Sequence, residues 1–153
     1  MGRLASGFKL LFANSRLIAE SFLNLLYYRI RVSITAPGGW IKDYNPMVTV
    51  NYRGSNLEEK PGQKEGPDKS CFDFLQVFNK VCGSTPWRST CMVRVLAAHR
   101  MLRKRKIRHA IHFGVKKGLN DKMEAHSWLT VGGQIFIGAE QREAYIEIGV
   151  FDF

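Results

Sequence analysis

The sequence predicts an α+β fold, with helices in its first two thirds and an antiparallel sheet at its C-terminal end. Apolar residues recur at helical spacing in three separate stretches that end near Leu102. Beyond Lys106 they alternate with polar residues instead, as they do in half-buried strands. The Gly132-Gly133 pair separates two of these alternating runs and is typical of a hairpin turn. Together these patterns predict strands at about 107–117, 124–132, 134–138 and 143–150.

Length and composition bound the class of protein. The chain has 153 residues, of which 45% are hydrophobic and 24% charged, so we expect a single domain over 1–153 with a real core. Its net charge of +10 favours acidic partners: nucleic acid, an anionic membrane, or an acidic protein or peptide. The three cysteines have no spacing typical of a disulfide framework or a zinc site, and they suit a reducing cytoplasm. We therefore expect a cytoplasmic protein with no metal and no cofactor.

Residues 1–35 are predicted to form an N-terminal helix. Charged and amide side chains interrupt the apolar run too often for a signal peptide or a membrane span. The polar residues Arg16, Glu20 and Asn24 share one side, and an apolar stripe through Ile18, Phe22 and Leu25 occupies another. Packing of this helix on the domain is the favoured interpretation. A helix lying on a membrane surface, flanked by arginines, is the alternative.

The middle of the chain contains a loop and a second helix. Residues 54–69 are rich in Gly, Pro, Glu and Lys and predict a flexible loop. The stretch from Cys71 to Cys82 predicts a helix that ends near Gly83, with both cysteines as packing residues. Residues 86–153 then form the expected catalytic core.

A third helix is expected to begin at Cys91. Pro86 and Gly83 break the preceding structure, and Ser89 or Thr90 is the predicted N-cap, whose side-chain oxygen would accept a backbone N–H. A cysteine in the first turn lies beside unpaired N–H groups, which favour the attacking thiolate and can also hold an oxyanion. On position alone, a small buried hydrophobe explains Cys91 equally well.

His126 lies on the second predicted strand, where alternation places it on the same face as Trp128 and Thr130. A histidine on a sheet that faces a cysteine at a helix start is the thiol–imidazole pair of cysteine hydrolases and acyl transferases. We therefore predict Cys91 as the nucleophile and His126 as its base.

Two motifs carry a family resemblance. The residues Pro86-Trp87-Arg88-Ser89-Thr90-Cys91 and Ala125-His126-Ser127-Trp128 resemble the leader-peptidase B proteins of lasso peptide biosynthesis. These proteins are a branch of the transglutaminase-like (papain-like) cysteine protease superfamily. The resemblance implies an α+β fold with the catalytic cysteine at a helix N-terminus and the histidine on an antiparallel sheet. It also implies a hydrolase of RiPP maturation and antibiotic biosynthesis that removes the leader from a ribosomally made precursor.

The resemblance also implies partners. The precursor peptide is the substrate, and a separate ATP-dependent lasso cyclase joins the newly exposed amine to an acidic side chain. The chain is expected to lack the leader-binding domain of some longer relatives. A separate leader-binding protein, a RiPP recognition element, would then deliver the precursor, and contact with a membrane surface stays an alternative for residues 1–32.

The resemblance leaves the third catalytic group open. Family members often carry an acid on the strand after the histidine strand, but that position falls near Gly138 here. Glu140 is the nearest acid and the favoured third member; a backbone carbonyl, another polar side chain or Asp121 are the alternatives. The residues predicted to hold the oxyanion or the substrate are Trp87, Ser89 and Trp128.

Two other functions fit the sequence. A different thiol acyl-transfer enzyme, such as a transglutaminase or deamidase, needs the same pair of residues. A non-catalytic basic module that binds peptide or nucleic acid would use the basic run from Arg100 to Arg108, although solvation at a helix end explains that run most simply. Nucleic acid is disfavoured because the aromatic residues do not interleave with the basic ones as a stacking platform requires. His109 and His112 have opposite strand parity and make a poor metal pair.

Overall fold

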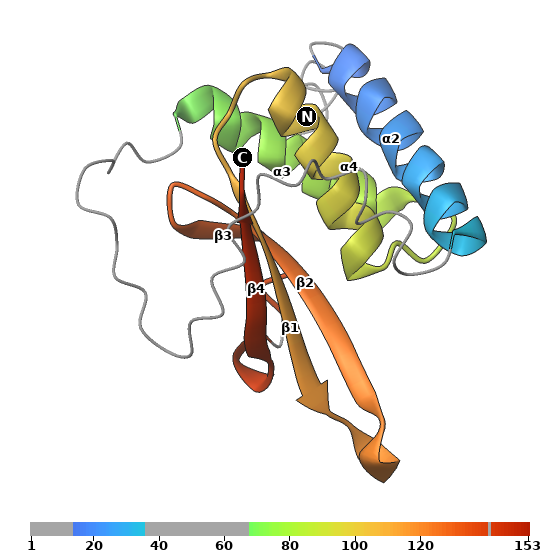
Figure 1. The fold of residues 1–153 in the computed structure, drawn as a ribbon. Coiled ribbons are helices and arrows are strands. Elements are labelled where there is room, and N and C mark those ends of the chain that lie inside the picture. Colours follow the sequence, from blue (N-terminus) through green and yellow to red (C-terminus); the bar gives the residue numbers. More distant parts are fainter. Residues whose placement is uncertain (1–13, 36–67, 141) are drawn as a thin grey trace, which may run out of the picture.

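The computed structural model describes residues 14–35, 68–140 and 142–153 (Figure 1). Within these ranges the chain forms three α-helices and one four-stranded antiparallel sheet, which confirms the α+β prediction. The helices are α2 (Ser15–Ile34), α3 (Lys69–Ser84) and α4 (Cys91–Lys104). The strands are β1 (Ala110–Lys117), β2 (Met123–Val131), β3 (Gln134–Ile137) and β4 (Ile146–Asp152). The first 13 residues of the expected N-terminal helix, and the expected loop up to residue 67, lie outside the described residues.

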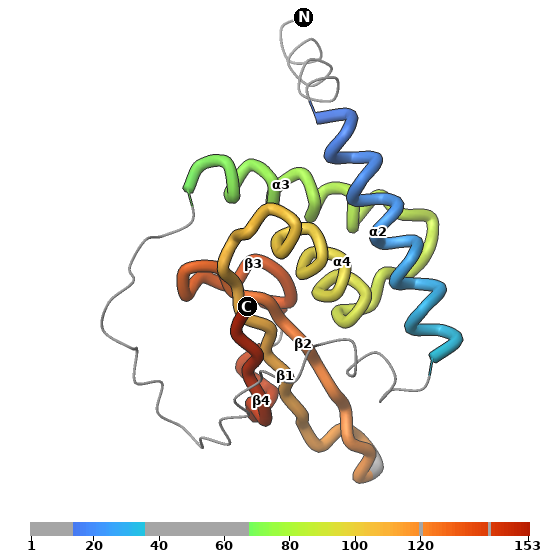
Figure 2. The backbone as a smooth tube through the Cα atoms, turned by 45° about the horizontal axis from the view of Figure 1, so that its top comes forward, coloured from blue at the N-terminus to red at the C-terminus, as the bar shows by residue number. Residues whose placement is uncertain are grey.

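The sheet has the strand order β3-β2-β1-β4. Its central pair, β1 and β2, aligns Ile111 with Leu129 and Gly114 with His126. Figure 1 shows the helices gathered over one end of the sheet, while the β1–β2 hairpin extends away from them. In Figure 2, α4 lies between the sheet and α2, which forms an outer side of the molecule.

Several predicted boundaries are shifted; β1, for example, begins at Ala110 and not at about 107. Helix α3 does not stop at Gly83 but continues to Ser84, and the extended backbone of Thr85 ends it. Strand β4 begins at Ile146, later than expected, because Arg142–Ala144 form a short 3-10 turn first. The shifts range from one residue at the end of α3 to three at the starts of β1 and β4, as is usual for predicted boundaries.

The core fills the space between the helices and one face of the sheet. Alternation along the strands directs Ile111, Leu129, Val131 and Ile137 toward the helices, where all four are buried. The helices contribute the buried side chains Leu25, Phe74, Leu75, Phe78, Val93, Val95, Met101 and Leu102. Cys71 and Cys82 are also buried in this core, which confirms them as packing residues.

Candidate active site

Cys91 is the first residue of α4, and it is partly exposed. Thr90 is the N-cap, but its side chain makes no capping hydrogen bond. The Ser89 hydroxyl lies 3.1 Å from the Thr85 hydroxyl, outside the helix. The predicted side-chain cap is therefore wrong. The Ser89 hydroxyl points to Thr85, and the Thr90 hydroxyl accepts no N–H of the helix. In the described structure, the first turn of α4 thus has no capping hydrogen bond from the Thr90 side chain.

The turn between α3 and α4 is fixed around Thr85. Its hydroxyl lies 3.2 Å from the carbonyl oxygen of Cys82 and 3.1 Å from that of Trp87, and it also contacts buried Ser89. The Trp87 ring packs against Phe22 of α2 with 5.1 Å between ring centroids. The indole Nε1 of Trp87 is buried without a hydrogen-bond partner among the described residues. This places one unused donor in the turn before Cys91, and the oxyanion role of Trp87 and Ser89 stays a prediction.

His126 lies in β2 and is half-buried. Its Nε2 is 2.9 Å from the carbonyl oxygen of Gly138, and its ring lies 4.9 Å from that of Tyr145. A carbonyl oxygen only accepts hydrogen bonds, so Nε2 is the protonated nitrogen. In the neutral ring, Nδ1 is then the nitrogen that can accept a proton, which is the tautomer a general base needs.

Gly138 has a conformation that only glycine adopts without strain. Its φ is +76°, and a Cβ atom there would lie 2.5 Å from the Ser127 carbonyl oxygen. The chain therefore packs directly on β2 as it leaves β3, and this brings the Gly138 carbonyl to His126. Of the groups left open by the sequence, the backbone carbonyl is the one that bonds the imidazole.

The two acidic candidates lie elsewhere. Glu140 is exposed and has no hydrogen bond to His126 in the described structure. Asp121 is exposed at the end of the β1–β2 hairpin, where it pairs with Lys117 at 2.7 Å. Neither carboxylate orients the imidazole in this arrangement, and the role of Glu140 stays a prediction.

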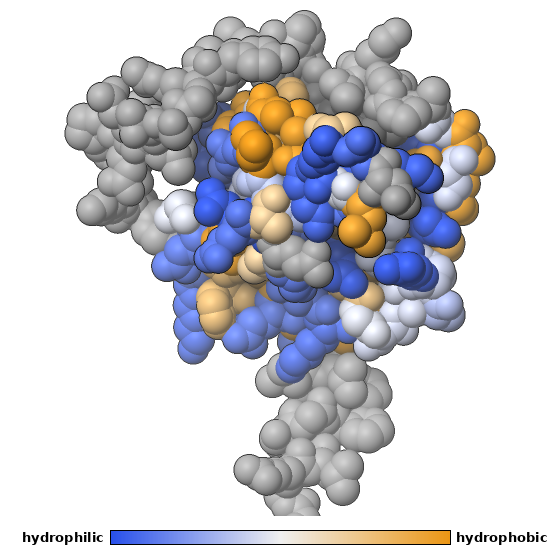
Figure 3. All heavy atoms as spheres, turned by 90° about the horizontal axis from the view of Figure 1, so that it is seen from below, coloured by the Kyte–Doolittle hydropathy of each residue, from blue (hydrophilic) through white to orange (hydrophobic). Residues whose placement is uncertain are grey.

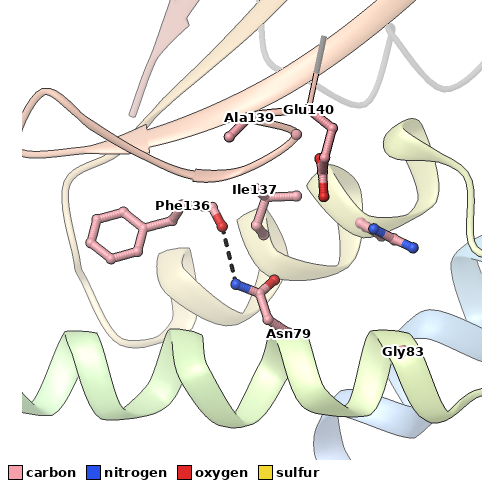
Figure 4. A pocket seen from close by; sticks show the side chains of 8 residues that line it. Asn79, Gly83, Phe136, Ile137, Ala139 and Glu140 are labelled. Atoms are coloured by element: carbon pink, nitrogen blue, oxygen red, sulfur yellow. Dashed lines mark hydrogen bonds between the residues drawn. The ribbon is translucent and has the colours of Figure 1, made fainter. Parts of the chain in front are cut away.

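A pocket of about 280 Å³ connects the start of α4 with the end of β3 (Figure 4). Its lining residues come from α3, α4 and the β3 segment: Asn79, Gly83, Arg94, Phe136, Ile137, Gly138, Ala139 and Glu140. Figure 4 shows Asn79 bonded across it to the Phe136 carbonyl, at 3.1 Å. Arg94 lies about one helical turn after Cys91, and its Nε is buried without a partner among the described residues. The pocket is therefore lined both by Gly138, whose carbonyl bonds His126, and by Arg94, which follows Cys91 in α4.

Cys91 and His126 belong to different elements, α4 and β2. No hydrogen bond joins the Cys91 thiol to the imidazole in the described structure. Buried Leu129 and Val131 point from β2 toward the helices, so alternation places His126 on the opposite face. Leu129 and Ile137 form the last residue pair between β2 and β3, and His126 lies on β2 beyond that pair. The direct pairing of Cys91 with His126 therefore stays a prediction.

The Trp128 indole packs against the His126 imidazole. The indole is 1% exposed and stacks on His126 with ring centroids 6.1 Å apart. On its other side it stacks on His112 at 5.4 Å, with the rings nearly parallel at 8°. A Cβ on Gly114 would lie 2.9 Å from the indole, so this glycine makes room for it. Trp128 thus has packing surroundings, and its predicted contact with substrate is untested.

Sequence reasoning missed the polar network beside this stack. His112 Nδ1 lies 2.9 Å from the Glu147 carboxylate, and Nε2 lies 2.9 Å from the Thr130 hydroxyl. Burial lowers the pKa of His112, while Glu147 acts in the opposite direction. Ile111 and His112 are neighbours on one strand, so their side chains point to opposite faces. This alternation was the one signal in the sequence that His112 faces away from the core. The described residues contain no group of three potential metal ligands.

Comparison with known proteins assigns the family. A family model described as the transglutaminase-like superfamily matches residues 48–150, which is more than half of the chain and includes both Cys91 and His126. The chain therefore belongs to the transglutaminase-like superfamily. Members of this superfamily are typically cysteine hydrolases or transferases, consistent with cysteine-based acyl transfer or proteolysis. No curated protein and no solved structure matches the chain.

Proposed function

We propose that the protein is a cysteine peptidase that removes the leader peptide from a ribosomally synthesised lasso peptide precursor. The transglutaminase-like superfamily supports the thiol chemistry, and the two lasso-type motifs support the substrate. The observation that carries the proposal is the position of Gly138. Its carbonyl bonds His126, and it lines the same pocket as Arg94, one turn after Cys91.

In the proposed reaction, His126 Nδ1 takes the proton of the Cys91 thiol, and the sulfur attacks the scissile carbonyl carbon. N–H groups of the uncapped first turn of α4 stabilise the resulting oxyanion. Collapse of this intermediate breaks the C–N bond, and the imidazolium gives its proton to the leaving amine of the core peptide. Water, deprotonated by His126, then hydrolyses the thioester, which releases the leader carboxylate and restores the thiol.

The proposal requires that Cys91 and His126 approach each other when substrate binds. This is a change from the described arrangement, in which His126 lies on the face of the sheet opposite the helices. In the described conformation the bond to Gly138 leaves Nδ1 as the proton acceptor of the neutral ring. Substrate delivery by a separate leader-binding protein fits a site that is incomplete on its own. We therefore expect slow cleavage by this protein alone and much faster cleavage with that partner, before an ATP-dependent cyclase uses the new amine.

Mass spectrometry of the precursor peptide tests the proposal. The native protein plus the leader-binding protein should release the leader, whereas Cys91→Ala and His126→Ala should not. Cys71→Ala is the matched control, since it removes a buried thiol that has no catalytic role, and it should retain cleavage while it stays folded. Cleavage by Cys91→Ala, or none by the folded native protein with its partner, would contradict the proposal.

A second acyl-transfer function is distinguished by the product. The transglutaminase-like superfamily also contains transferases. The same spectra would then show a changed or cross-linked glutamine in place of a new N-terminus. A non-catalytic binding module would give neither product.

A further inference from the structure

The outward side of α2 carries a row of exposed apolar side chains. Ile34 is 78% exposed, Leu23 62%, Ile30 53% and Tyr27 42%. Their spacing in the helix places them on one stripe, opposite the fully buried Leu25. We call these four residues, Leu23, Tyr27, Ile30 and Ile34, the outer stripe. Helix α2 thus has a second apolar side, which the described part of the domain leaves in solvent.

Positive charge borders the outer stripe. The Arg31 guanidinium donates a hydrogen bond to the Tyr27 hydroxyl at 2.8 Å, and the Arg100 guanidinium of α4 lies 5.1 Å from the centre of the Tyr27 ring. The one acidic residue of α2, Glu20, is already paired with Lys104 and Arg105. The stripe itself contains no acidic residue, and Arg31 and Arg100 lie beside it.

The apolar stripe and the arginines beside it indicate which kind of partner binds this side of α2. A second copy of the chain would bring another net charge of +10 to the same basic border, so charge repulsion disfavours self-association. Figures 1 and 2 show α2 on the outside of the molecule, and a single outer helix presents a convex ridge. Figure 3, which views the molecule from below, shows apolar (orange) atoms interspersed with hydrophilic (blue) ones on that face. A bilayer accepts a convex apolar ridge bordered by basic residues, without a complementary groove.

We propose that the outer stripe docks the protein on an anionic lipid surface. Leu23, Ile30 and Ile34 enter the boundary between headgroups and acyl chains, while Arg31 and Arg100 contact lipid phosphates. No helix in the described ranges is long and apolar enough to cross a bilayer, so this contact is peripheral. The inference goes beyond the proposed peptidase function and concerns a surface that contributes none of the candidate catalytic residues.

Sedimentation of the full chain with lipid vesicles tests the proposal. The native protein should pellet with vesicles of equal parts phosphatidylcholine and phosphatidylglycerol at low salt. It should stay in solution with pure phosphatidylcholine, or at high salt. The double variant Leu23→Gln/Ile30→Gln should bind the anionic vesicles at least about tenfold more weakly. Leu119→Gln is the matched control: Leu119 is 87% exposed at the far end of the β1–β2 hairpin, and its loss should change nothing.

Charge and apolar contact are tested separately. Arg100→Gln should weaken binding and flatten its salt dependence, because one headgroup contact is lost. If the double variant does not fold, Ile34→Gln in the last turn of α2 takes its place and should also weaken binding. Absence of binding to anionic vesicles, equal binding by the stripe variants, or a dimer in vesicle-free solution would each overturn the proposal. Precursor cleavage in vesicle-free solution should be the same for the stripe variants and the native protein, so the two proposals fail independently.

Discussion

The two ends of α4 differ in how their backbone groups are satisfied. At the start, Thr90 gives no side-chain cap and the thiol of Cys91 is partly exposed. At the other end, the N–H of Arg105 bonds the Leu102 and Arg103 carbonyls, and Ile107 N–H also bonds Leu102. The closed end serves stability. The open end keeps the positive pole of the helix available, as a nucleophilic cysteine requires.

The closed end also contains a buried histidine pair. His99 Nδ1 and His109 Nε2 lie 2.8 Å apart, and the His109 Nδ1 lies 2.7 Å from the Ile107 carbonyl oxygen. Burial favours the neutral form of both rings, so His109 donates from Nδ1 to the carbonyl and accepts at Nε2 from His99. Phe153 packs on His99 at 4.3 Å, and its backbone pairs with that of His109. The pair thus fastens the C-terminal residues to the end of α4.

Acidification should produce the largest change at the closed end. Burial lowers the pKa of His99 from 6.5 to about 3, and burial also lowers the pKa of His109. Below pH 6.5 the unfolded chain binds protons that the folded chain does not, so stability falls as the pH falls. Each histidine can remove up to about 1.4 kcal/mol per pH unit. Urea unfolding near pH 7 and near pH 5 should show this loss, and His99→Gln should reduce it; an equal loss in both proteins would contradict the assignment.

The ion pair between α2 and α4 should give the next largest effect. Arg105 donates to Glu20 at 2.6 Å, and this bond lowers the pKa of the Glu20 carboxyl. Glu20→Gln should lower the free energy of unfolding by about 1–2 kcal/mol near neutral pH, because Arg105 loses its charged partner. Glu143→Gln, on an exposed 3-10 turn, is the control and should change little. The difference between Glu20→Gln and the native protein should shrink as the pH falls below 4.5, where the unfolded carboxyl is protonated.

Filling the open end should separate stability from reactivity. Thr90→Asp places a carboxylate at the N-cap, where it can accept first-turn N–H groups and add about 0.5–1 kcal/mol of stability. The same charge disfavours a thiolate at Cys91, so alkylation should slow by about tenfold. Calorimetry and alkylation kinetics on one preparation measure both changes. Unchanged alkylation would show that the open end does not activate the thiol.

Removal of the Thr90 side chain should have the smallest effect. Thr90→Ala should change the free energy of unfolding by less than about 0.5 kcal/mol, because the hydroxyl caps nothing. The start of α3 provides the comparison, since the Asp68 carboxylate accepts the Cys71 N–H at 2.8 Å. Asp68→Ala should therefore cost about 1 kcal/mol. Equal losses in the two variants would mean that both helix starts are capped.

The sequence predicted the elements better than the contacts. Helical stripes and strand alternation depend on residues near each other in the chain, and they identified the three helices and the shared face of His126, Trp128 and Thr130. The sequence could not single out the Gly138 carbonyl as the partner of His126. Every residue carries a backbone carbonyl, and only the fold directs this one to the imidazole. The cap at Thr90 failed for a related reason: residue type shows that a side chain can cap, but the local geometry decides whether it does.

Alkylation of the three cysteines tests the central claim, that Cys91 acts with His126. Cys82 is buried, with a pKa raised to about 12, and burial also raises the pKa of Cys71, so both serve as internal references. Iodoacetamide modification should be followed site by site by mass spectrometry across pH, in the native protein and in His126→Gln. The account predicts that Cys91 reacts fastest, keeps its reactivity at mildly acidic pH, and loses that advantage in His126→Gln. A Cys91 rate that matches the reference cysteines, or that does not depend on His126, would contradict it.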